Sequence, residues 1–196
     1  MIPRLYHGAS TILTPDKMGV GPLRPLVGVT VHYTGDVGME RIRESLLKEG
    51  LGYHLVVAKS GYVTQLTYLD LRVQHAGKAT WNGRSPNRTH VAVAIESYGK
   101  LQHVDGKGYL AWNGARVEIG KVATRPDNLL HVQSPWDIAT TKQEASLKAV
   151  LHWFLSYGIL PINICGHDEC AIPLGRKTDP GGVLSMSMQD IRKSLV

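Results

Sequence analysis

Runs of apolar and polar residues divide this chain into a series of strands and helices. Near-continuous apolar runs at residues 27–33 and 90–96 are typical of strands buried on both faces of a sheet. Residues 53–58 and 62–66 form two shorter runs on either side of a glycine-bearing turn, which predicts a β-hairpin. A further short apolar run at 162–165 predicts one more strand near the C-terminal end.

Apolar residues recur at helical spacing in three places. Between residues 39 and 49 they alternate with charged residues and stop at Gly50, which predicts an amphipathic helix. Residues 141–144 (TKQE) match a capping box, and apolar residues then follow at helical spacing until near Gly158. A last short helix, from about residue 188 to residue 195, closes the chain.

Strands that alternate with helices, together with one hairpin, predict an α/β fold. We expect a single domain with a central mixed β-sheet flanked by helices on both faces. At 196 residues the chain is long enough for one sizeable core and too short for two comfortable ones. Residues 1–26 lack a sustained period and are expected to form an irregular lead-in, so the main domain covers 27–196. Residues 99–136, rich in glycine and proline, are expected to form an inserted loop or hairpin region.

The composition limits where the protein acts and what it attracts. A net charge of +6 and a pI near 9.4 favour a polyanionic partner such as nucleic acid, an anionic membrane or an anionic cell wall. No apolar run approaches the roughly 20 residues of a membrane span, so we expect no membrane insertion. The first residues lack the pattern of a secretion signal. We therefore expect synthesis in the cytoplasm, with delivery by other means if the protein acts outside it.

The segment from residue 166 to residue 182 has the features of a metal-binding corner. His167 emerges at the end of the predicted strand at 162–165. Asp179 lies beside Pro180 and two glycines, which can fold its carboxylate back toward an imidazole. Lys177 adds a cation nearby.

A hydrolytic zinc site needs three protein ligands and one open position for water. The third candidate ligand is His32, because it ends the apolar run at 27–33 and would lie near His167 if the two strands are neighbours. Cys170 is a rival, since a thiolate also binds zinc. Cys165 is expected to be a small buried core residue, and with only two cysteines we expect no disulfide framework.

Glu96, His75, Tyr53 and Lys177 stand at positions typical of a site, and for three of them a plainer interpretation is also open. Glu96 places a charge at the end of an apolar strand, where it could instead pair with a buried cation. His75 lies in a polar, glycine-punctuated loop of the kind that often lines a site. Tyr53 could be a half-buried strand tyrosine and Lys177 a solvated surface lysine.

Taken together, these motifs resemble the type 2 N-acetylmuramoyl-L-alanine amidases, a family that includes phage endolysins and the peptidoglycan recognition proteins. The resemblance runs in register from about residue 27 to residue 182. It is carried by His32 in VHYT, Tyr53 in GYHLVV, His75 in HAG, Glu96 after its strand, and His167 in GH with Lys177 and Asp179 in KTDPG.

The resemblance implies a zinc ion held by His32, His167 and Asp179, with water in the fourth position. It implies that Lys177 stabilises the oxyanion. It further implies that Tyr53 and Glu96 assist water activation or stabilise the intermediate, and that His75 contacts substrate. The segment 99–136 and the residues Asp168-Glu169-Cys170 depart from the family pattern.

The expected activity is hydrolysis of the amide bond between N-acetylmuramic acid and L-alanine in peptidoglycan, by an endolysin-like enzyme that acts on the cell wall. The alternatives are a cytosolic amidase that recycles muropeptides, a delivered antibacterial effector, or a muropeptide-binding module without activity. The presence of all three implied ligands favours catalysis over binding alone. A regulator that binds nucleic acid or a polymerase is disfavoured as a primary role, because the chain lacks a recognition motif. We expect a monomer.

Overall fold

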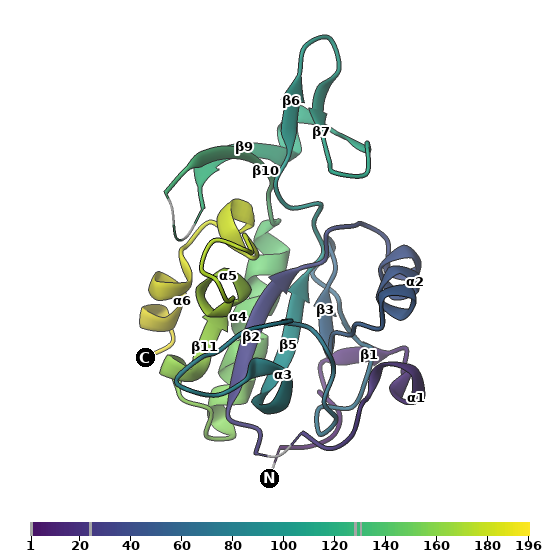
Figure 1. The fold of residues 1–196 in the computed structure, drawn as a ribbon, viewed down its shortest axis with the longest axis vertical. Coiled ribbons are helices and arrows are strands. Elements are labelled where there is room, and N and C mark those ends of the chain that lie inside the picture. The colour runs from purple at the N-terminus through teal and green to yellow at the C-terminus, as the bar shows by residue number, and fades with distance from the viewer. Residues whose placement is uncertain (1, 24, 128, 130) are drawn as a thin grey trace.

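A six-stranded mixed sheet forms the centre of the computed structural model, which describes residues 2–23, 25–127, 129 and 131–196. Positions 1 and 24 of the predicted lead-in, and positions 128 and 130 of the predicted insertion, lie outside the described residues. The strand order is β1-β4-β3-β5-β2-β11 (Figure 1). These strands are β1 (Ala9–Thr11), β2 (Gly28–Tyr33), β3 (Leu55–Val57), β4 (Val63–Gln65), β5 (His90–Ile95) and β11 (Ile164–Gly166).

Four neighbouring strands run in the same direction, so their carboxyl ends lie along one edge of the sheet. The four strands β3, β5, β2 and β11 run parallel, whereas β3 and β4 form the predicted antiparallel hairpin. The carboxyl ends of the four parallel strands therefore lie together, at the edge where open α/β sheets usually carry their sites. The α/β fold predicted from the sequence, with a central mixed sheet, is confirmed.

Helices cover both faces of the sheet, and the alternation of strand residues decides which helix each face meets. Val56, Ala92 and Ala94 pack against Ile42 and Leu46 of one helix, α2. The alternate positions of the same strands pack against α4 on the opposite face. The α-helices are α1 (Pro15–Met18), α2 (Met39–Glu49), α3 (Pro86–Thr89), α4 (Thr141–Ser156), α5 (His167–Cys170) and α6 (Met188–Ser194), with short 3-10 turns at Ile119–Lys121, Pro161–Asn163 and Gly181–Val183.

The segment after β5 forms two small sheets that project beyond the carboxyl edge of the central sheet (Figure 1). Its core contains Leu101, Ala111 and Val117. The indole N–H of Trp112 donates a 2.6 Å hydrogen bond to the carbonyl of Gly35, which ties this segment to the loop after β2. Its strands are β6 (Gln102–Val104), β7 (Gly108–Leu110), β8 (Arg116–Val117), β9 (Val122–Pro126) and β10 (Gln133–Asp137).

Three details of the sequence prediction need correction. The first 26 residues hold more regular structure than predicted, because β1 pairs with β4 at the edge of the sheet and α1 follows it. The predicted strand at 162–165 begins only at Ile164, since the residues before it form a 3-10 turn. The cap of α4 is Thr140, whose side chain accepts from the amide of Gln143, so the capping box starts one residue earlier than predicted.

The described helices give no sign of a membrane span. None of them combines the length and the apolar character that crossing a bilayer requires.

Candidate metal centre

Two histidines and an aspartate come together at the carboxyl edge of the central sheet. His32 is the penultimate residue of β2, and His167 is the first residue of α5, directly after β11. Because β11 pairs with β2 in parallel, the two strands bring both histidines to the same end of the sheet. Asp179 returns from the following loop, where its carbonyl accepts a 2.7 Å hydrogen bond from the amide of Asp168.

The side chains of His32, His167 and Asp179, which we call the metal cluster, converge on one another. Asp179 Oδ2 lies 2.8 Å from His32 Nδ1 and 2.9 Å from His167 Nδ1. The three potential ligand atoms all lie within 4.8 Å of one another. Each of the three residues is at most 7% exposed. Within the described part of the chain, this group has the spacing needed to hold a metal ion.

The ring nitrogens that face away from the metal cluster are also engaged. His32 Nε2 lies 2.9 Å from His75 Nδ1, and His167 Nε2 lies 3.0 Å from the carbonyl oxygen of Ala76. A carbonyl oxygen can only accept, so His167 must carry a proton on Nε2. When this ring is neutral, the lone pair of its Nδ1 points toward Asp179.

This donor set fits a divalent cation such as zinc. When His167 is neutral and Asp179 is ionised, a lone pair on His167 Nδ1 faces a lone pair on Asp179 Oδ2 across 2.9 Å. The two lone pairs repel each other, and a cation bound between them makes the arrangement favourable. Imidazole and carboxylate are both zinc ligands, and three protein ligands leave one tetrahedral position open. The residues present therefore suit a catalytic rather than a closed structural site.

Burial and hydrogen bonding shift the acid–base properties of the metal cluster. Burial lowers the pKa of His32 to about 4, although the nearby Asp179 carboxylate opposes this shift. Burial alone would raise the pKa of Asp179, but its interactions with the adjacent His167 and His32 rings outweigh burial and hold that pKa well below its ordinary value. At neutral pH His32 is therefore uncharged and Asp179 ionised, which are the states that bind a metal.

Tyr53 and Lys177 are the two predicted catalytic residues with a physical link to the metal cluster. The Tyr53 ring packs 5.2 Å from the His32 ring, centroid to centroid, and its hydroxyl donates a 3.4 Å hydrogen bond to the Tyr33 carbonyl. Burial raises the pKa of Tyr53 above its usual value, and the nearby Asp179 charge raises it further, so the phenol stays protonated. Lys177 is exposed, and its charge contributes to the lowered pKa of His32.

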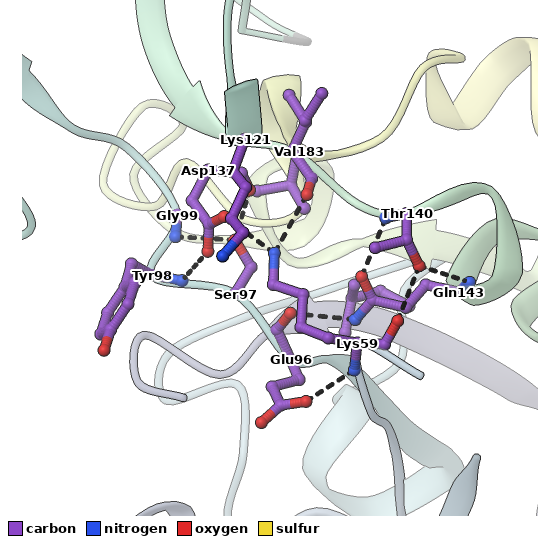
Figure 2. A network of polar contacts seen from close by, with 12 residues as sticks. Lys59, Glu96, Ser97, Tyr98, Gly99, Lys121, Asp137, Thr140, Gln143 and Val183 are labelled. Atoms are coloured by element: carbon purple, nitrogen blue, oxygen red, sulfur yellow. Dashed lines mark hydrogen bonds and ion pairs between the residues drawn. The ribbon is translucent and has the colours of Figure 1, made fainter. Parts of the chain in front are cut away.

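Glu96 belongs to a different set of hydrogen bonds (Figure 2). One carboxylate oxygen accepts a 2.7 Å hydrogen bond from the amide of Gly38, and the other accepts a 2.6 Å bond from the amide of Lys59. These two amides belong to the loops after β2 and β3. Both of its oxygens therefore hold backbone, and the predicted role of Glu96 in proton transfer stays a prediction beside this anchoring role.

Glu96 is part of what we call the anchoring network, made of Lys59, Glu96, Asp137 and Gln143 (Figure 2). The ammonium of Lys59 donates to Asp137 Oδ1 at 2.8 Å and to the Ile138 carbonyl at 3.0 Å. The side-chain amide of Gln143 donates to the carbonyl of Val57, the last residue of β3, and to the carbonyl of Glu96, directly after β5. The network thereby joins the carboxyl ends of two strands to the start of α4.

His75 lies behind His32 and is only 6% exposed. Its Nδ1 faces His32, and its Nε2 lies 3.3 Å from the carbonyl of Pro86. Burial lowers the pKa of His75 well below its ordinary value, so the ring is neutral. His75 thus contacts a candidate metal ligand, and its predicted contact with substrate stays a prediction.

Both cysteines are buried and outside the metal cluster. The thiol of Cys170 donates a 3.5 Å hydrogen bond to the carbonyl of His167. Cys165 Sγ lies 3.6 Å from the hydroxyl of Thr30. The geometry therefore favours Asp179 over Cys170 as the third ligand.

Sequence reasoning missed three residues that surround the metal cluster. Ala76 contributes only its backbone carbonyl, and because every residue has one, this contact cannot be predicted from the residue type. Asn87 and Arg176 also act on the backbone of the same loop. A glycine-bearing loop next to His75 was the one available sign that backbone would approach the site closely.

Comparisons with known proteins identify a family for most of this chain. The family model described as "N-acetylmuramoyl-L-alanine amidase" matches residues 22–182. The search of curated proteins finds no match.

Three similar solved structures share the fold. The amidase AmiD from E. coli, in complex with the substrate anhydro-N-acetylmuramic acid-L-Ala-D-γ-Glu-L-Lys, is 19% identical, with a TM-score of 0.60 over 86% of this chain and 56% of AmiD. AmpDh3 from Pseudomonas aeruginosa, in complex with anhydromuramic pentapeptide, is 19% identical, with a TM-score of 0.61 over 99% of this chain and 66% of AmpDh3. The endolysin amidase LysCS from Clostridium intestinale is 16% identical, with a TM-score of 0.58 over 96% of this chain and 97% of LysCS.

Proposed function

The chain belongs to the N-acetylmuramoyl-L-alanine amidase family of enzymes, and from this premise we propose that it is a zinc-dependent hydrolase of bacterial peptidoglycan. The bond that it cuts is the amide between the lactyl group of N-acetylmuramic acid and L-alanine. One observation carries the proposal: His32, His167 and Asp179 converge from two strand ends and a loop, with ligand atoms within 4.8 Å of one another.

The proposed zinc ligands are His32 Nδ1, His167 Nδ1 and Asp179, because these atoms face one another. When bound, zinc supplies Lewis acidity, which lowers the pKa of a water molecule from about 15.7 to about 7 and polarises a carbonyl group. The low pKa values of His32 and Asp179 keep these side chains in the forms that bind a metal at neutral pH.

Lys177 and Tyr53 supply the remaining chemistry in this proposal. The exposed ammonium of Lys177 stabilises the negative charge that develops on the carbonyl oxygen of the substrate. Tyr53 keeps its phenolic proton and lies against His32, and we propose that its hydroxyl exchanges the long 3.4 Å hydrogen bond to the Tyr33 carbonyl for one to the intermediate. For Glu96 we propose an anchoring role, because both of its oxygens accept from backbone amides.

We place the activity on the intact cell wall. The net charge of +6 attracts the protein to anionic wall polymers, an attraction that salt weakens. The similarity to the endolysin amidase LysCS supports the same assignment. A second candidate is an amidase that acts on soluble muropeptides, and it is favoured by the similarity to AmiD and AmpDh3, whose structures contain anhydromuramic peptides.

The test is mass spectrometry of the products released by the purified protein from sacculi and, separately, from a soluble anhydromuropeptide. We expect peptides with a free L-alanine amino group, release that a chelator abolishes, and recovery when zinc is restored. A protein that binds muropeptide with zinc present but releases nothing would be a binding module. Cleavage of the soluble muropeptide alone would assign the recycling function.

The projecting segment 99–136 gives this enzyme a surface next to the site, and we propose that it affects substrate choice. Trp112 is 74% exposed, and its indole is held against Gly35, three residues after His32. An aromatic face in this position can stack on a sugar ring of a glycan strand. We expect Trp112→Ala to slow cleavage of sacculi a few-fold more than cleavage of a small muropeptide, measured as kcat/KM for each. Equal effects on both substrates would count against a glycan contact.

A further inference from the structure

Two consecutive residues, His75 and Ala76, each contact one of the two candidate ligand histidines on the side facing away from Asp179. The side chain of His75 meets His32 Nε2 at 2.9 Å, and the backbone carbonyl of Ala76 meets His167 Nε2 at 3.0 Å. The two histidines come from different strands, whereas these contacts come from one short loop. The position of this loop therefore affects both rings together.

Two backbone carbonyls fix where the ring protons lie when the three rings are neutral. The carbonyl of Ala76 can only accept, so His167 carries its proton on Nε2 and has a lone pair on Nδ1. The carbonyl of Pro86 likewise places the proton of His75 on Nε2, which makes His75 Nδ1 an acceptor. His32 must then donate from Nε2, and its Nδ1 is also left with a lone pair. Both lone pairs face Asp179.

Asn87 holds the loop that makes these contacts. Its Oδ1 accepts hydrogen bonds from the amide of His75 at 2.9 Å and from the amide of Ala76 at 2.8 Å. Its Nδ2 donates to the carbonyl of Gly77 at 2.9 Å. A single half-buried side chain thus binds the backbone of three consecutive residues, and it stands next to Pro86 in the short helix α3.

Arg176 braces the same loop from the segment that carries Asp179. Its guanidinium donates to the carbonyls of Ala76 and Lys78 at 3.1 and 2.9 Å. The carbonyl of Ala76 therefore accepts from both Arg176 and His167, one donor for each of its lone pairs.

We propose that Asn87 is a positioning residue for the metal centre, and that it holds residues 75–77 so that His75 and Ala76 fix both ligand histidines in the Nε2–H tautomer. Asn87 acts on the metal through His32 and His167 and contacts neither substrate nor metal. The inference rests on the proposed zinc site and deepens it, because it names what orients the ligands.

The main test compares zinc affinity, measured by competition with a chromophoric chelator, for the parent protein and for Asn87→Ala. Partners of this kind typically contribute 10- to 100-fold in metal affinity, so we expect Asn87→Ala to bind zinc about 10- to 100-fold more weakly. Asn87→Asp keeps an acceptor for the two amides but sets a carboxylate oxygen against the Gly77 carbonyl, so it should lose less affinity than Asn87→Ala. Arg88→Ala, at the neighbouring exposed position of α3, is the matched control and should leave the affinity unchanged.

Nitrogen-15 NMR of the histidine side chains in the metal-free proteins, at a pH where the rings are neutral, separates positioning from general loss of structure, because bound zinc would itself fix the tautomers. The parent should show Nε2–H tautomers for both His32 and His167, and Asn87→Ala should broaden or mix both sets of signals. His75→Ala should disturb His32 and leave His167 as in the parent, because Ala76 still supplies its carbonyl. This second variant keeps the proposal testable if Asn87→Ala fails to fold.

Zinc affinity equal to the parent in a folded Asn87→Ala protein would overturn the inference. So would unchanged tautomers in both variants, or a loss of stability in the metal-free protein without a loss of affinity. These outcomes leave the proposed hydrolase untouched. A parent protein that binds zinc in the expected tautomers but cleaves no muropeptide would overturn the hydrolase and leave the role of Asn87 intact.

Discussion

Two groups of charged and polar side chains lie at the carboxyl edge of the same sheet, and they differ in how their hydrogen bonds are completed. In the anchoring network every hydrogen-bond donor faces an acceptor: the Lys59 ammonium donates to Asp137, and two backbone amides donate to Glu96. In the metal cluster, ring nitrogens and a carboxylate oxygen turn toward one another. The first arrangement is complete without a ligand, whereas the second becomes favourable when a cation joins it.

The hydrogen-bond partners of a charged side chain distinguish a structural role from a functional one. Its position at the end of a strand does not make this distinction. Glu96 follows β5 just as His167 follows β11, so both qualify as strand-end residues. Glu96 binds the backbone of two loops that it must hold in place, whereas His167 directs one nitrogen to a backbone carbonyl and the other to Asp179. The partners of a side chain, rather than its place along the chain, indicate its role.

The largest effect is expected from removing a member of the metal cluster. Asp179→Ala deletes the carboxylate that both histidines face, so zinc binding and amide cleavage should both be lost. The loss of zinc affinity should exceed the roughly 10- to 100-fold that is typical of removing a partner outside the ligand set. Metal analysis and product analysis on sacculi measure the two losses.

Cys170→Ser is the matched control for Asp179→Ala, because Cys170 is buried beside His167 but lies outside the metal cluster. It should keep the zinc content of the parent. Retention of zinc by Asp179→Ala together with its loss in Cys170→Ser would make Cys170 the third ligand instead of Asp179.

The second-largest effect is expected at Lys177, which lies beside the metal cluster without belonging to it. Removing one stabiliser of an oxyanion typically costs about 3 to 4 kcal/mol, so Lys177→Ala should lower kcat roughly 100- to 1,000-fold. Zinc content should stay at the parental level, and KM should change less than kcat.

Lys148→Ala, at an exposed position of α4, controls for the loss of one positive charge from the protein. If Lys177→Ala and Lys148→Ala lower the rate equally, Lys177 acts through general attraction to the wall and not through the oxyanion. Salt dependence of both variants would support that reading.

The sequence predicted the parts of the site that local patterns encode. His32 and His167 follow apolar runs, and the parallel pairing of those runs brings the two rings together. The hydrogen-bond partners of Glu96 could not be predicted, because the amides of Gly38 and Lys59 lie 58 and 37 residues away along the chain. Only the folded loops show that both of its oxygens are engaged.

Local patterns also failed where two positions satisfied the same rule. Thr140 and Thr141 each stand three residues before a Gln or Glu, so both match a capping box. The structure uses Thr140 with Gln143, and Glu144 instead accepts hydrogen bonds from Ser185. The choice is made by tertiary contacts, since Gln143 also holds the ends of two strands.

The individual strands of the projecting segment, predicted only as a loop or hairpin region, could not be placed for a related reason. Each of β6, β7 and β8 has two or three residues, too few for a clear alternation, and glycines lie between them. These strands are stabilised by pairing and by a small core around Leu101 that includes Val117. Neither contribution can be seen in a short window of sequence.

A third prediction tests the anchoring network through its ion pair. Asp137 is buried and Lys59 is a quarter exposed by side chain, so Asp137→Ala leaves the ammonium and the amide of Tyr98 without their carboxylate. We expect a loss of about 2 to 3 kcal/mol in the free energy of unfolding of the metal-free protein. Zinc affinity of the folded fraction should stay close to the parental value.

Lys193→Ala is the control for Asp137→Ala, because it breaks an exposed ion pair with Asp190 that should contribute less than about 1 kcal/mol. Denaturant unfolding of both variants gives the comparison. Equal and small losses would mean that the anchoring network contributes no more than a surface pair.

The smallest effect, and the one that most directly tests the assignment of Glu96, is expected for Glu96→Gln. A glutamine keeps one acceptor oxygen and turns an N–H₂ group toward the other backbone amide, at Gly38 or Lys59, so one hydrogen bond is lost. The expected cost is about 1 to 3 kcal/mol of stability, with kcat of the folded, zinc-loaded enzyme within about two-fold of the parent. A general acid or base behaves differently, because a glutamine cannot exchange the proton and turnover falls about 100-fold or more while stability barely changes. Measuring unfolding and kcat on the same preparation decides between these outcomes, and the second one would move Glu96 from the anchoring network to the chemistry of the metal cluster.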